Sequence, residues 1–239
     1  MTSSRSTVNV RGENRVLALL GAAERQRIVQ RCEKVRLPQH TVVYRANSEI
    51  GEVYFPLSGM ASLVISTEDG QTVEVGMIGN EGMIGTQLVL GASRSPADAV
   101  VQVESDFLRM TRKDLELELN AGSALRSAAQ RFSQALANQV AQSVLCNRLH
   151  SVEQRLCRWF VMTHDRVASD EIFLTHQFVA QMLGVRRASV TVAVGVLQKA
   201  GLVSYSRERL VILNRPGLEA GACECYEVVQ AELERLLKA

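Results

Sequence analysis

The sequence predicts an α+β protein in which strands and helices occupy separate parts of the chain. Three observations support this prediction. Residues 37–110 hold short β-prone runs between glycine-containing turns, residues 113–149 hold no proline and a single glycine, and residues 175–213 read helix, glycine turn, helix and hairpin. Strands grouped before helices are typical of α+β folds. We therefore expect a β domain, a long helix and a C-terminal helical domain, in that order.

Length and composition indicate a globular protein without membrane segments. The chain has 239 residues, of which 46% are hydrophobic, enough for two modest cores. It holds no apolar run of about 18 residues, so no membrane span or membrane partner is expected. The N-terminus leads into no long apolar segment, which excludes a secretory signal. We expect a cytoplasmic protein whose residues 1–14 form a mobile tail.

The cysteines and histidines are scattered along the chain, which favours a reducing compartment. The cysteines are Cys32, Cys146, Cys157, Cys223 and Cys225. Cys223 and Cys225 are close enough to share a metal, but nothing nearby in the sequence completes a set of about four ligands. The sequence therefore predicts no metal site and no cofactor.

A short helix is expected over residues 21–35, ahead of the strands. The β-prone runs are Thr41–Tyr44, Glu52–Pro56, Ser62–Ser66, Thr72–Met77, Ala99–Val103 and Phe107–Met110. Residues 67–70 form a hairpin turn, because Asp-Gly adopts positive φ readily. Short strands at even spacing predict a small β-sandwich or barrel.

Residues 113–149 are expected to form one long helix with a narrow apolar edge, followed by a hinge at 147–150. Its side chains repeat at intervals of four and three residues, as in a coiled coil. The edge comprises Leu125, Ala129, Phe132, Leu136 and Gln139. This pattern favours pairing of two copies into a homodimer. The alternative is that the edge packs against the chain's own β domain.

The C-terminal domain begins with a capping box, in which Ser151 precedes Gln154 by three residues. The helix that follows carries the single tryptophan, Trp159, which we expect in the core. Thr175 is a suitable N-cap for the next helix, and Gly184 ends it because glycine enters the left-handed region cheaply. Two helices joined in this way pack steeply, and the second can lie in a DNA major groove.

A hairpin with a basic tip follows the second helix. Residues 202–205 and 210–213 are β-prone and flank Ser-Arg-Glu-Arg, so the whole segment predicts a winged helix-turn-helix. Residues 147–215 hold 10 basic and 5 acidic side chains, whereas residues 1–146 hold 15 of each. The positive excess thus lies where a phosphate-contacting surface would need it.

The motifs resemble those of the Crp/Fnr family of bacterial transcription regulators over nearly the whole chain. Residues 175–190, Thr-His-Gln-x-x-Ala-x-x-Leu-Gly-Val-x-Arg-x-Ser-Val, are similar to that family's helix-turn-helix signature. Residues 51–59 resemble its strand-and-turn motif, and residues 78–85 resemble the glycine-rich loop of its effector pocket.

The resemblance implies an architecture and a set of partners. We expect a cyclic-nucleotide-binding-like β-roll, also called a double-stranded β-helix, over 15–112, and a central dimerisation helix over 113–149. A winged helix-turn-helix DNA-binding domain would follow over 150–239. The implied partners are a second copy of the chain, palindromic double-stranded DNA, RNA polymerase and an unidentified small-molecule effector.

The resemblance also implies which residues contact DNA. They are Thr175, His176, Gln177, Arg186, Arg187, Ala188, Ser189, Thr191, Val192 and Arg207. Arg187 is suited to the O6 and N7 atoms of guanine, and Ala188 and Val192 to thymine methyl groups. Thr175, Gln177 and Ser189 match phosphate-contacting positions, which set register without reading sequence.

The effector pocket departs from the family pattern. Its candidate residues are Gly85, Thr86, Arg94, Ser95 and Ala97. Members that bind cyclic AMP have a glutamate where Thr86 stands and an arginine near Pro96. Loss of the charge-assisted hydrogen bonds between this arginine and the cyclic phosphate makes the free energy of binding less favourable by a few kcal/mol. We therefore expect an effector other than cyclic AMP.

Two alternatives remain beside a DNA-binding regulator that responds to something other than a cyclic nucleotide. One is a cyclic-nucleotide-responsive regulator, in which Arg94 and Ser95 substitute for the missing anion site. The other is an effector-binding module that uses its helix-turn-helix for protein contacts. We find no nucleophile–base set and no phosphate-cradling loop, so no catalytic residues and no enzyme are predicted.

Overall fold

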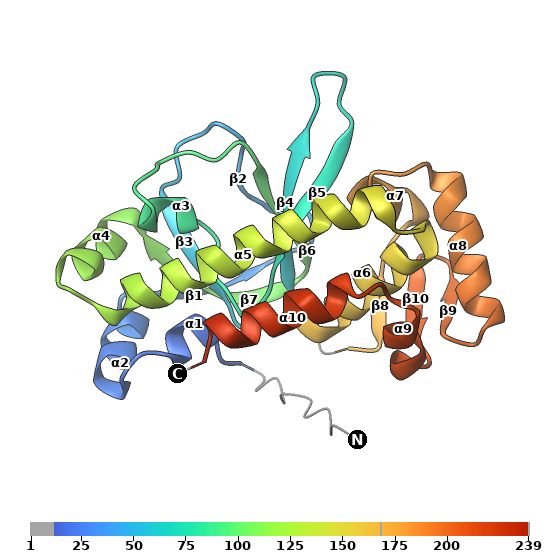
Figure 1. Cartoon of the computed structure of the whole chain (residues 1–239). Helices are drawn as coiled ribbons and strands as arrows, with labels where there is room; N and C mark the ends of the chain where they lie inside the picture. Colours follow the sequence, from blue (N-terminus) through green and yellow to red (C-terminus); the bar gives the residue numbers. More distant parts are fainter. Residues whose placement is uncertain (1–11, 168, 239) are drawn as a thin grey trace.

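Two antiparallel sheets form the N-terminal half of the protein. The computed structural model describes residues 12–167 and 169–238. One sheet has the order β1-β7-β3 and the other β2-β6-β4-β5. Their strands are β1 (Glu33–Leu37), β2 (Val42–Tyr44), β3 (Glu52–Pro56), β4 (Met60–Ser66), β5 (Thr72–Ile78), β6 (Asp98–Val103) and β7 (Ser105–Thr111). Figure 1 shows the hairpin between β4 and β5 projecting from the body of the molecule.

The six predicted strands are confirmed, but the first strand was missed. The helix expected over 21–35 is shorter, since α2 (Ala22–Gln30) ends at Gln30 and β1 begins three residues later. β1 pairs only with β7, and its residues are exposed or half-buried. An edge strand of this kind carries charged side chains in place of an apolar pattern, so it could not be recognised from the sequence.

The mobile tail predicted for residues 1–14 is wrong at Asn14. Residues 1–11 lie outside the described residues, but Asn14 is buried and caps α1 (Arg15–Ala18) by accepting from Leu17 N at 3.2 Å. Its side-chain amide donates to Gly82 O at 2.7 Å and to Pro56 O at 3.1 Å. Asn14 therefore belongs to the β domain, because its amide satisfies carbonyls that the strands leave free.

The helical region after the sheets is divided in two. A helix α4 (Arg112–Asn120) precedes the long helix α5 (Ala124–Leu149), and the break contains Gly122 at φ +75°. The single helix predicted for 113–149 is therefore wrong, because this glycine takes up the left-handed conformation that ends α4. The hinge is also shorter than predicted, since α5 continues to Leu149 and only His150 and Ser151 precede α6 (Val152–Val167).

The C-terminal domain is a winged helix-turn-helix, as predicted. After α6 come β8 (Glu171–Phe173), α7 (His176–Leu183), α8 (Arg187–Lys199), β9 (Val203–Ser206) and β10 (Arg209–Ile212). The three strands form a sheet of order β8-β10-β9. The predicted capping box is present, since Ser151 and Gln154 exchange side-chain-to-backbone hydrogen bonds at 3.1 and 3.3 Å.

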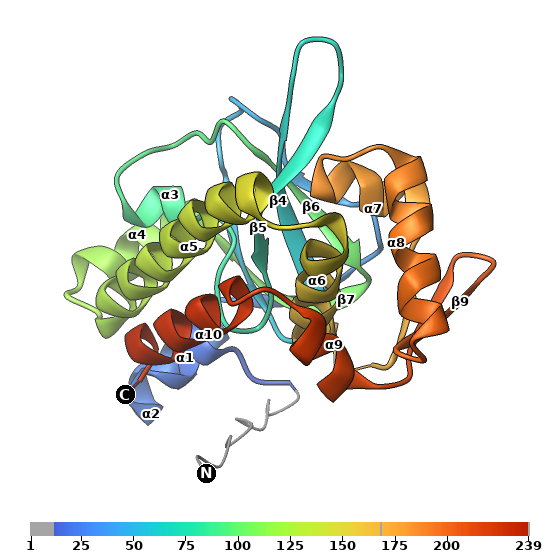
Figure 2. The same cartoon turned by 45° about the vertical axis from the view of Figure 1, so that its right-hand side comes forward.

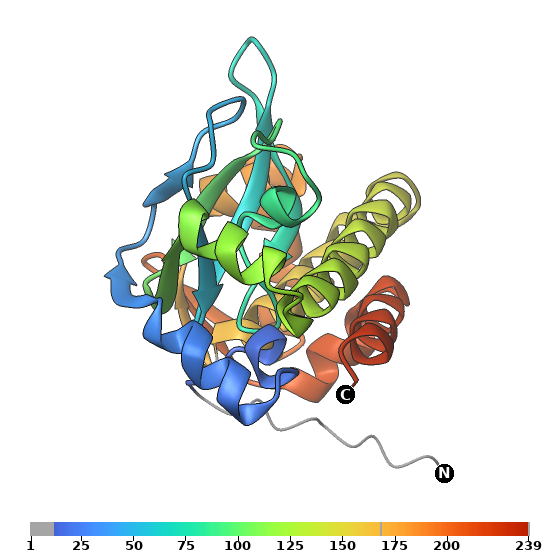
Figure 3. The same ribbon diagram turned by 90° about the vertical axis from the view of Figure 1, so that its left-hand side faces the viewer.

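Two helices that the sequence did not predict end the chain. They are α9 (Arg215–Gly221) and α10 (Cys225–Leu236). Figures 1 and 3 show α10 lying beside α5, on the flank that the β-roll leaves open. The C-terminal segment thus returns to the N-terminal half of the molecule. A short helix α3 (Thr86–Val89) completes the β-roll.

The two halves share a hydrophobic core. Met60, Val64 and Met77 of the β-roll belong to the same buried cluster as the residues that fill the C-terminal domain. Figure 2 shows α6 and α7 placed against β4 and β5. The C-terminal domain is therefore docked on the β-roll in this conformation. None of the described helices combines the length and apolar character that a membrane crossing requires.

Candidate nucleic-acid interface and sensory domain

Local capping and packing fix α8 on the surface of the C-terminal domain. The Thr175 hydroxyl caps α7 by accepting from Phe178 N at 2.9 Å, and Gly184 ends α7 at φ +62°. Val190, Val194 and Leu197 are buried and hold the inner face of α8. The opposite face is consequently presented to solvent in a fixed orientation.

The exposed face of α8 contains half of the ten predicted contact residues. The exposed ones are Arg186, Arg187, Ala188, Thr191 and Val192, whereas Ser189 is half-buried. The face continues into Val196 and Lys199, which the sequence reasoning missed. Val192 is 64% and Val196 48% exposed, unusual values for valine on a rigid helix. The spacing of four from Val192 to Val196 was the signal that could have found them.

The predicted contacts outside α8 divide into exposed and packed residues. Gln177 on α7 and Arg207 at the hairpin tip are exposed, and Arg207 lies in a positive-φ turn. His176 stacks on Tyr205 at 4.3 Å, and its Nδ1 lies 3.0 Å from Thr191 Oγ1. Burial, and then the Arg187 charge, lower the pKa of His176, so it is neutral at pH 7. His176 therefore joins α7 to the wing and to α8.

The positive charge of the surface comes from fewer residues than the sequence count suggests. Arg155, Arg158 and Arg166 are buried, while Arg209 pairs with Glu171, and Arg215 with Asp165. Apart from the paired Arg209, the exposed basic residues on α8 and the wing are Arg186, Arg187, Lys199 and Arg207. None of these four has a carboxylate within 4.0 Å in the described part of the chain, which leaves them available to phosphates.

The candidate effector residues do not gather around an inward-facing charge. Thr86, Ser95 and Ala97 are buried, but Arg94 is 62% exposed, 3.7 Å from Glu49, and donates to Asn47 O. The substitute anion site predicted for Arg94 and Ser95 is thus not assembled in this conformation. Tyr44 lies near the Ser95 hydroxyl, and burial raises the pKa of this tyrosine.

The backbone conformation at Gly85 and its close contact with Val53 require glycine. Its φ is +95°, and a Cβ at this position would lie 2.8 Å from Val53 Cγ1. The backbone of the loop therefore requires glycine whether or not a ligand binds there.

Two family models match this chain. A cyclic nucleotide-binding domain matches residues 34–120, and a Crp-like helix-turn-helix domain matches residues 154–220. Together the two matches span more than half of the chain. The chain belongs to the Crp/Fnr family of transcription regulators. Members of this family are DNA-binding regulators and not enzymes.

Individual relatives of this Crp/Fnr regulator are distant. It is 22% identical over 200 residues to the anaerobic regulatory protein of Bacillus subtilis, covering 80% of this chain and 84% of the relative. It is 25% identical over 171 residues to the global nitrogen regulator of Synechococcus elongatus, covering 68% of this chain and 77% of the relative.

Solved structures share the fold at still lower identity. FixK2 from Bradyrhizobium japonicum superimposes with a TM-score of 0.68 at 13% identity, covering 80% of this chain and 98% of that one. The c-di-GMP-responsive regulator CLP from Xanthomonas campestris gives 0.61 at 17% identity, covering 80% and 99%. These similarities establish the α+β architecture of a β-roll, a central helix and a helix-turn-helix domain.

The five residues chosen for the dimer seam of this Crp/Fnr regulator face its own β-roll. Phe132 lies against Gly82, where a Cβ would be 2.0 Å from the ring, and Leu136 packs on Gly76. Gln139 accepts from Met77 N at 2.7 Å and donates to Met77 O at 3.2 Å. The remaining two, Leu125 and Ala129, are also buried. The seam prediction is thus corrected, and the alternative of packing within the chain describes this face.

A different face of α5 is open to solvent. Its exposed residues are Gln130, Gln134, Ala137, Ala141, Val144, Leu145 and Leu149. They repeat every three or four positions, and Val144 and Leu149 are each 68% exposed. The sequence reasoning missed this second stripe because it selected the larger side chains of the first.

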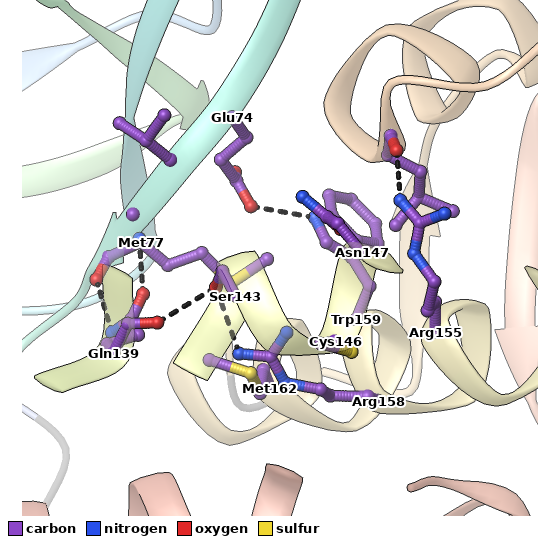
Figure 4. Close-up of a pocket in the computed structure, with 13 residues that line it drawn as sticks. Glu74, Met77, Gln139, Ser143, Cys146, Asn147, Arg155, Arg158, Trp159 and Met162 are labelled. Carbon is purple, nitrogen blue, oxygen red and sulfur yellow. Dashed lines mark hydrogen bonds between the residues drawn. The ribbon is translucent and has the colours of Figure 1, made fainter. Parts of the chain in front are cut away.

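Buried polar groups join the β-roll to the DNA-binding half. A cavity of about 30 Å³ lies between β5, the end of α5 and α6. Figure 4 shows the side chains that line it. At its edge, Trp159 Nε1 donates to Glu74 Oε1 at 3.0 Å, and the Ser62 hydroxyl donates to the other carboxylate oxygen. Burial raises the pKa of Glu74 to about 7, partly opposed by these hydrogen bonds. Trp159 is buried, as predicted, and also links the two halves.

A second buried pair lies beside the glycine-rich loop. Arg166 of α6 contacts Glu81 through Nη2 at 2.7 Å and Nε at 2.9 Å, and both side chains are almost fully buried. Gly79 lies against the Arg166 side chain, where a Cβ would be 2.6 Å from Cγ. The loop assigned to the effector pocket therefore also contacts the DNA-binding domain, through Gly79 and Glu81, and α5, through Gly82.

Proposed function

We propose that this protein is a homodimeric, sequence-specific regulator that binds a palindromic DNA site through α8. The observation that carries the proposal is the exposed face of α8, where unpaired arginines stand beside solvent-exposed valines. Buried residues on the opposite face hold the helix rigidly. Such a combination suits a major groove, in which base edges and thymine methyl groups alternate.

Each contact residue has a role in this proposal. Arg187, near the N-terminus of α8, forks to guanine, and Val192 and Val196 contact thymine methyl groups. Arg186, Lys199 and Arg207 contact phosphates, and Gln177 sets the register. Thr175 and His176 position the motif through their hydrogen bonds and stacking.

The second copy of the chain binds to the open face of α5. Ala137, Ala141 and Val144 allow two helices to approach closely, since their side chains are small or short. When the two-fold axis runs along the paired helices, the same stripe meets itself and the two recognition helices lie on one side of the assembly. Half-sites about 34 Å apart would then be read together.

The β-roll controls this activity through its contact with the DNA-binding domain. An effector bound near Gly85, or a change at the Glu74–Trp159 contact, would favour one orientation of α6 over another. The proposed effector is not cyclic AMP, because Thr86 replaces the carboxylate and no arginine points inward beside the buried Ser95. Contact with RNA polymerase is part of the same proposal.

Selection from random duplexes tests the proposed function. We expect an inverted repeat whose half-sites are centred about 10 base pairs apart and differ from those of cyclic-AMP receptors, because Ala188 and Val192 offer no polar readout. Recovery of that familiar consensus would refute the assigned contacts. Failure to enrich any duplex, with or without added nucleotides, would favour a protein-contact role for the helix-turn-helix.

A further inference from the structure

The structure brings together three cysteines and a histidine that are far apart in the sequence. Cys146 lies in the last turn of α5 and His150 directly follows that helix, while Cys223 lies just before α10 and Cys225 is its first residue. Their four ligand atoms are all within 4.8 Å of one another. The Cys146 and Cys223 sulfurs are 3.4 Å apart, and Cys225 Sγ is 3.5 Å from His150 Nδ1. The sequence prediction of no metal site did not include this juxtaposition.

The Cys146–Cys223 and Cys225–His150 distances are close to the edges of a tetrahedral site around one metal ion. With zinc about 2.3 Å from sulfur and about 2.0 Å from nitrogen, tetrahedral ligands lie about 3.8 Å apart for two sulfurs and about 3.5 Å for sulfur and nitrogen. An iron–sulfur cluster holds several irons, each with its own thiolate, so its protein ligands stand farther apart. The observed spacing therefore favours a mononuclear ion.

The surroundings of the histidine and cysteines are those of metal ligands. His150 Nε2 lies 3.2 Å from Glu224 Oε1, which leaves Nδ1 free to face the sulfurs. A carboxylate on the far ring nitrogen is the usual partner of a zinc-bound histidine, because it fixes the tautomer and the ring orientation. Gln142 Nε2 donates to Cys225 Sγ at 3.1 Å, as a thiolate would require. The three cysteines are at most 3% exposed.

Two buried arginines supply the charge that such a centre needs. Zinc with three thiolates and a neutral imidazole carries one net negative charge. Arg155 and Arg158 line the same cavity as Cys146, and each is 8% exposed. Neither has a carboxylate within 4.0 Å in residues 12–167 and 169–238, and the Nε atoms of both lack a hydrogen-bond partner. An anionic metal centre explains how two unpaired cations are tolerated there.

We propose that Cys146, His150, Cys223 and Cys225 form a closed zinc site that clamps the end of α5 to α10. Zinc is the ion that a site of three thiolates and one imidazole selects. Binding displaces three thiol protons to solvent, and all four positions are filled by the protein, so the site is structural. Because His150 lies in the hinge between α5 and α6, the metal would fix where the DNA-binding domain begins.

Metal analysis of the reduced full-length protein tests the proposal. We expect one tightly held zinc ion per chain. Replacement by Co²⁺ should give visible bands of a tetrahedral ion and a near-ultraviolet thiolate-to-cobalt charge-transfer band. Cys223→Ser and Cys225→Ser should each reduce that band and weaken zinc binding. The matched controls Cys32→Ser and Cys157→Ser should change neither, since those cysteines lie outside the cluster.

Residues that contact the proposed ligands provide a second test, in which zinc binding is weakened but not lost. Glu224→Gln should weaken zinc binding by about tenfold, because it removes the carboxylate partner of His150. A wild-type protein that retains no zinc and yields no thiolate-to-cobalt band would overturn the proposal, and so would iron with acid-labile sulfide. None of these measurements needs DNA, and the wild-type metal analysis needs no variant, so the outcome is independent of the proposed function.

Discussion

At the scale of single residues, Glu74 is the clearest place where chemistry joins the two halves. Its carboxyl receives hydrogen bonds from Ser62 of the β-roll and from Trp159 of the DNA-binding half. Burial raises the pKa of Glu74 from 4.5 to about 7. The docked state therefore holds a proton that a solvent-exposed carboxyl would already have released.

This pKa gives a pH dependence with a definite sign. A carboxyl whose pKa is raised on docking stabilises the docked state least at high pH, so the contact weakens as pH rises from about 4.5 and reaches its weakest above about 7. Trp159 is the single tryptophan, so its fluorescence reports the contact. We expect a fluorescence titration with a midpoint near 7 that Glu74→Gln abolishes. An identical titration in Glu74→Gln would contradict the assignment.

Gly82 offers a second test at the scale of a residue. A Cβ there would overlap the Phe132 ring, so Gly82→Ala must push α5 away from the β-roll. Overpacking of this kind costs about 1–3 kcal/mol, and we expect that loss in the free energy of unfolding by urea. Gly51→Ala is the matched control, because nothing lies within 4 Å of its would-be Cβ. Equal effects of the two substitutions would argue against a tight contact at Gly82.

At the scale of elements, α5 is the helix around which the molecule is organised. One face covers the β-roll, a second is covered by α10, and a third is open. Asn138 donates to Glu232 of α10 at 2.8 Å, and Arg131 donates to Lys238 O at 3.1 Å. The proposed dimer therefore has only the third face of α5 available to it.

A charge on the open face of α5 tests the dimer. Ala141→Glu places like charges opposite each other in a two-fold interface, and we expect it to shift sedimentation from dimer to monomer. Leu117→Glu on α4, where Leu117 is 49% exposed and outside α5, should leave the dimer intact. A dimer that persists in Ala141→Glu would mean that another surface joins the two copies.

The elements also show what the sequence can and cannot predict. The pair α7–α8 was predictable because its signals are local, namely the Thr175 cap, the left-handed Gly184 and the buried stripe of α8. What packs on the Phe132 face of α5 could not be predicted, because the spacing of apolar residues reveals an apolar face but not the element that covers it. The thiol cluster was hidden for a similar reason, because Cys146 and Cys223 are 77 residues apart and meet only when α10 returns to α5.

At the scale of the whole molecule, the structure is a docked arrangement with an accessible recognition helix. The core that Met60, Val64 and Met77 share with the C-terminal domain, together with the Arg166–Glu81 pair, holds α6 and α7 on the β-roll. Meanwhile α8 lies at the outer edge of the molecule (Figure 1). Regulation in the proposed account changes the orientation of α8 relative to its copy and leaves its surface unchanged.

The central claim is that α8 reads DNA. Equilibrium binding to a selected duplex tests it most directly, measured over a series of salt concentrations for the full-length wild type and for Arg187→Ala. We expect the logarithm of the affinity to fall steeply and linearly with the logarithm of the salt concentration, because phosphate contacts release counterions. Arg187→Ala should lose about 1–3 kcal/mol and relax one base position. Absence of binding at low salt, or an unchanged affinity and base preference in Arg187→Ala, would contradict it.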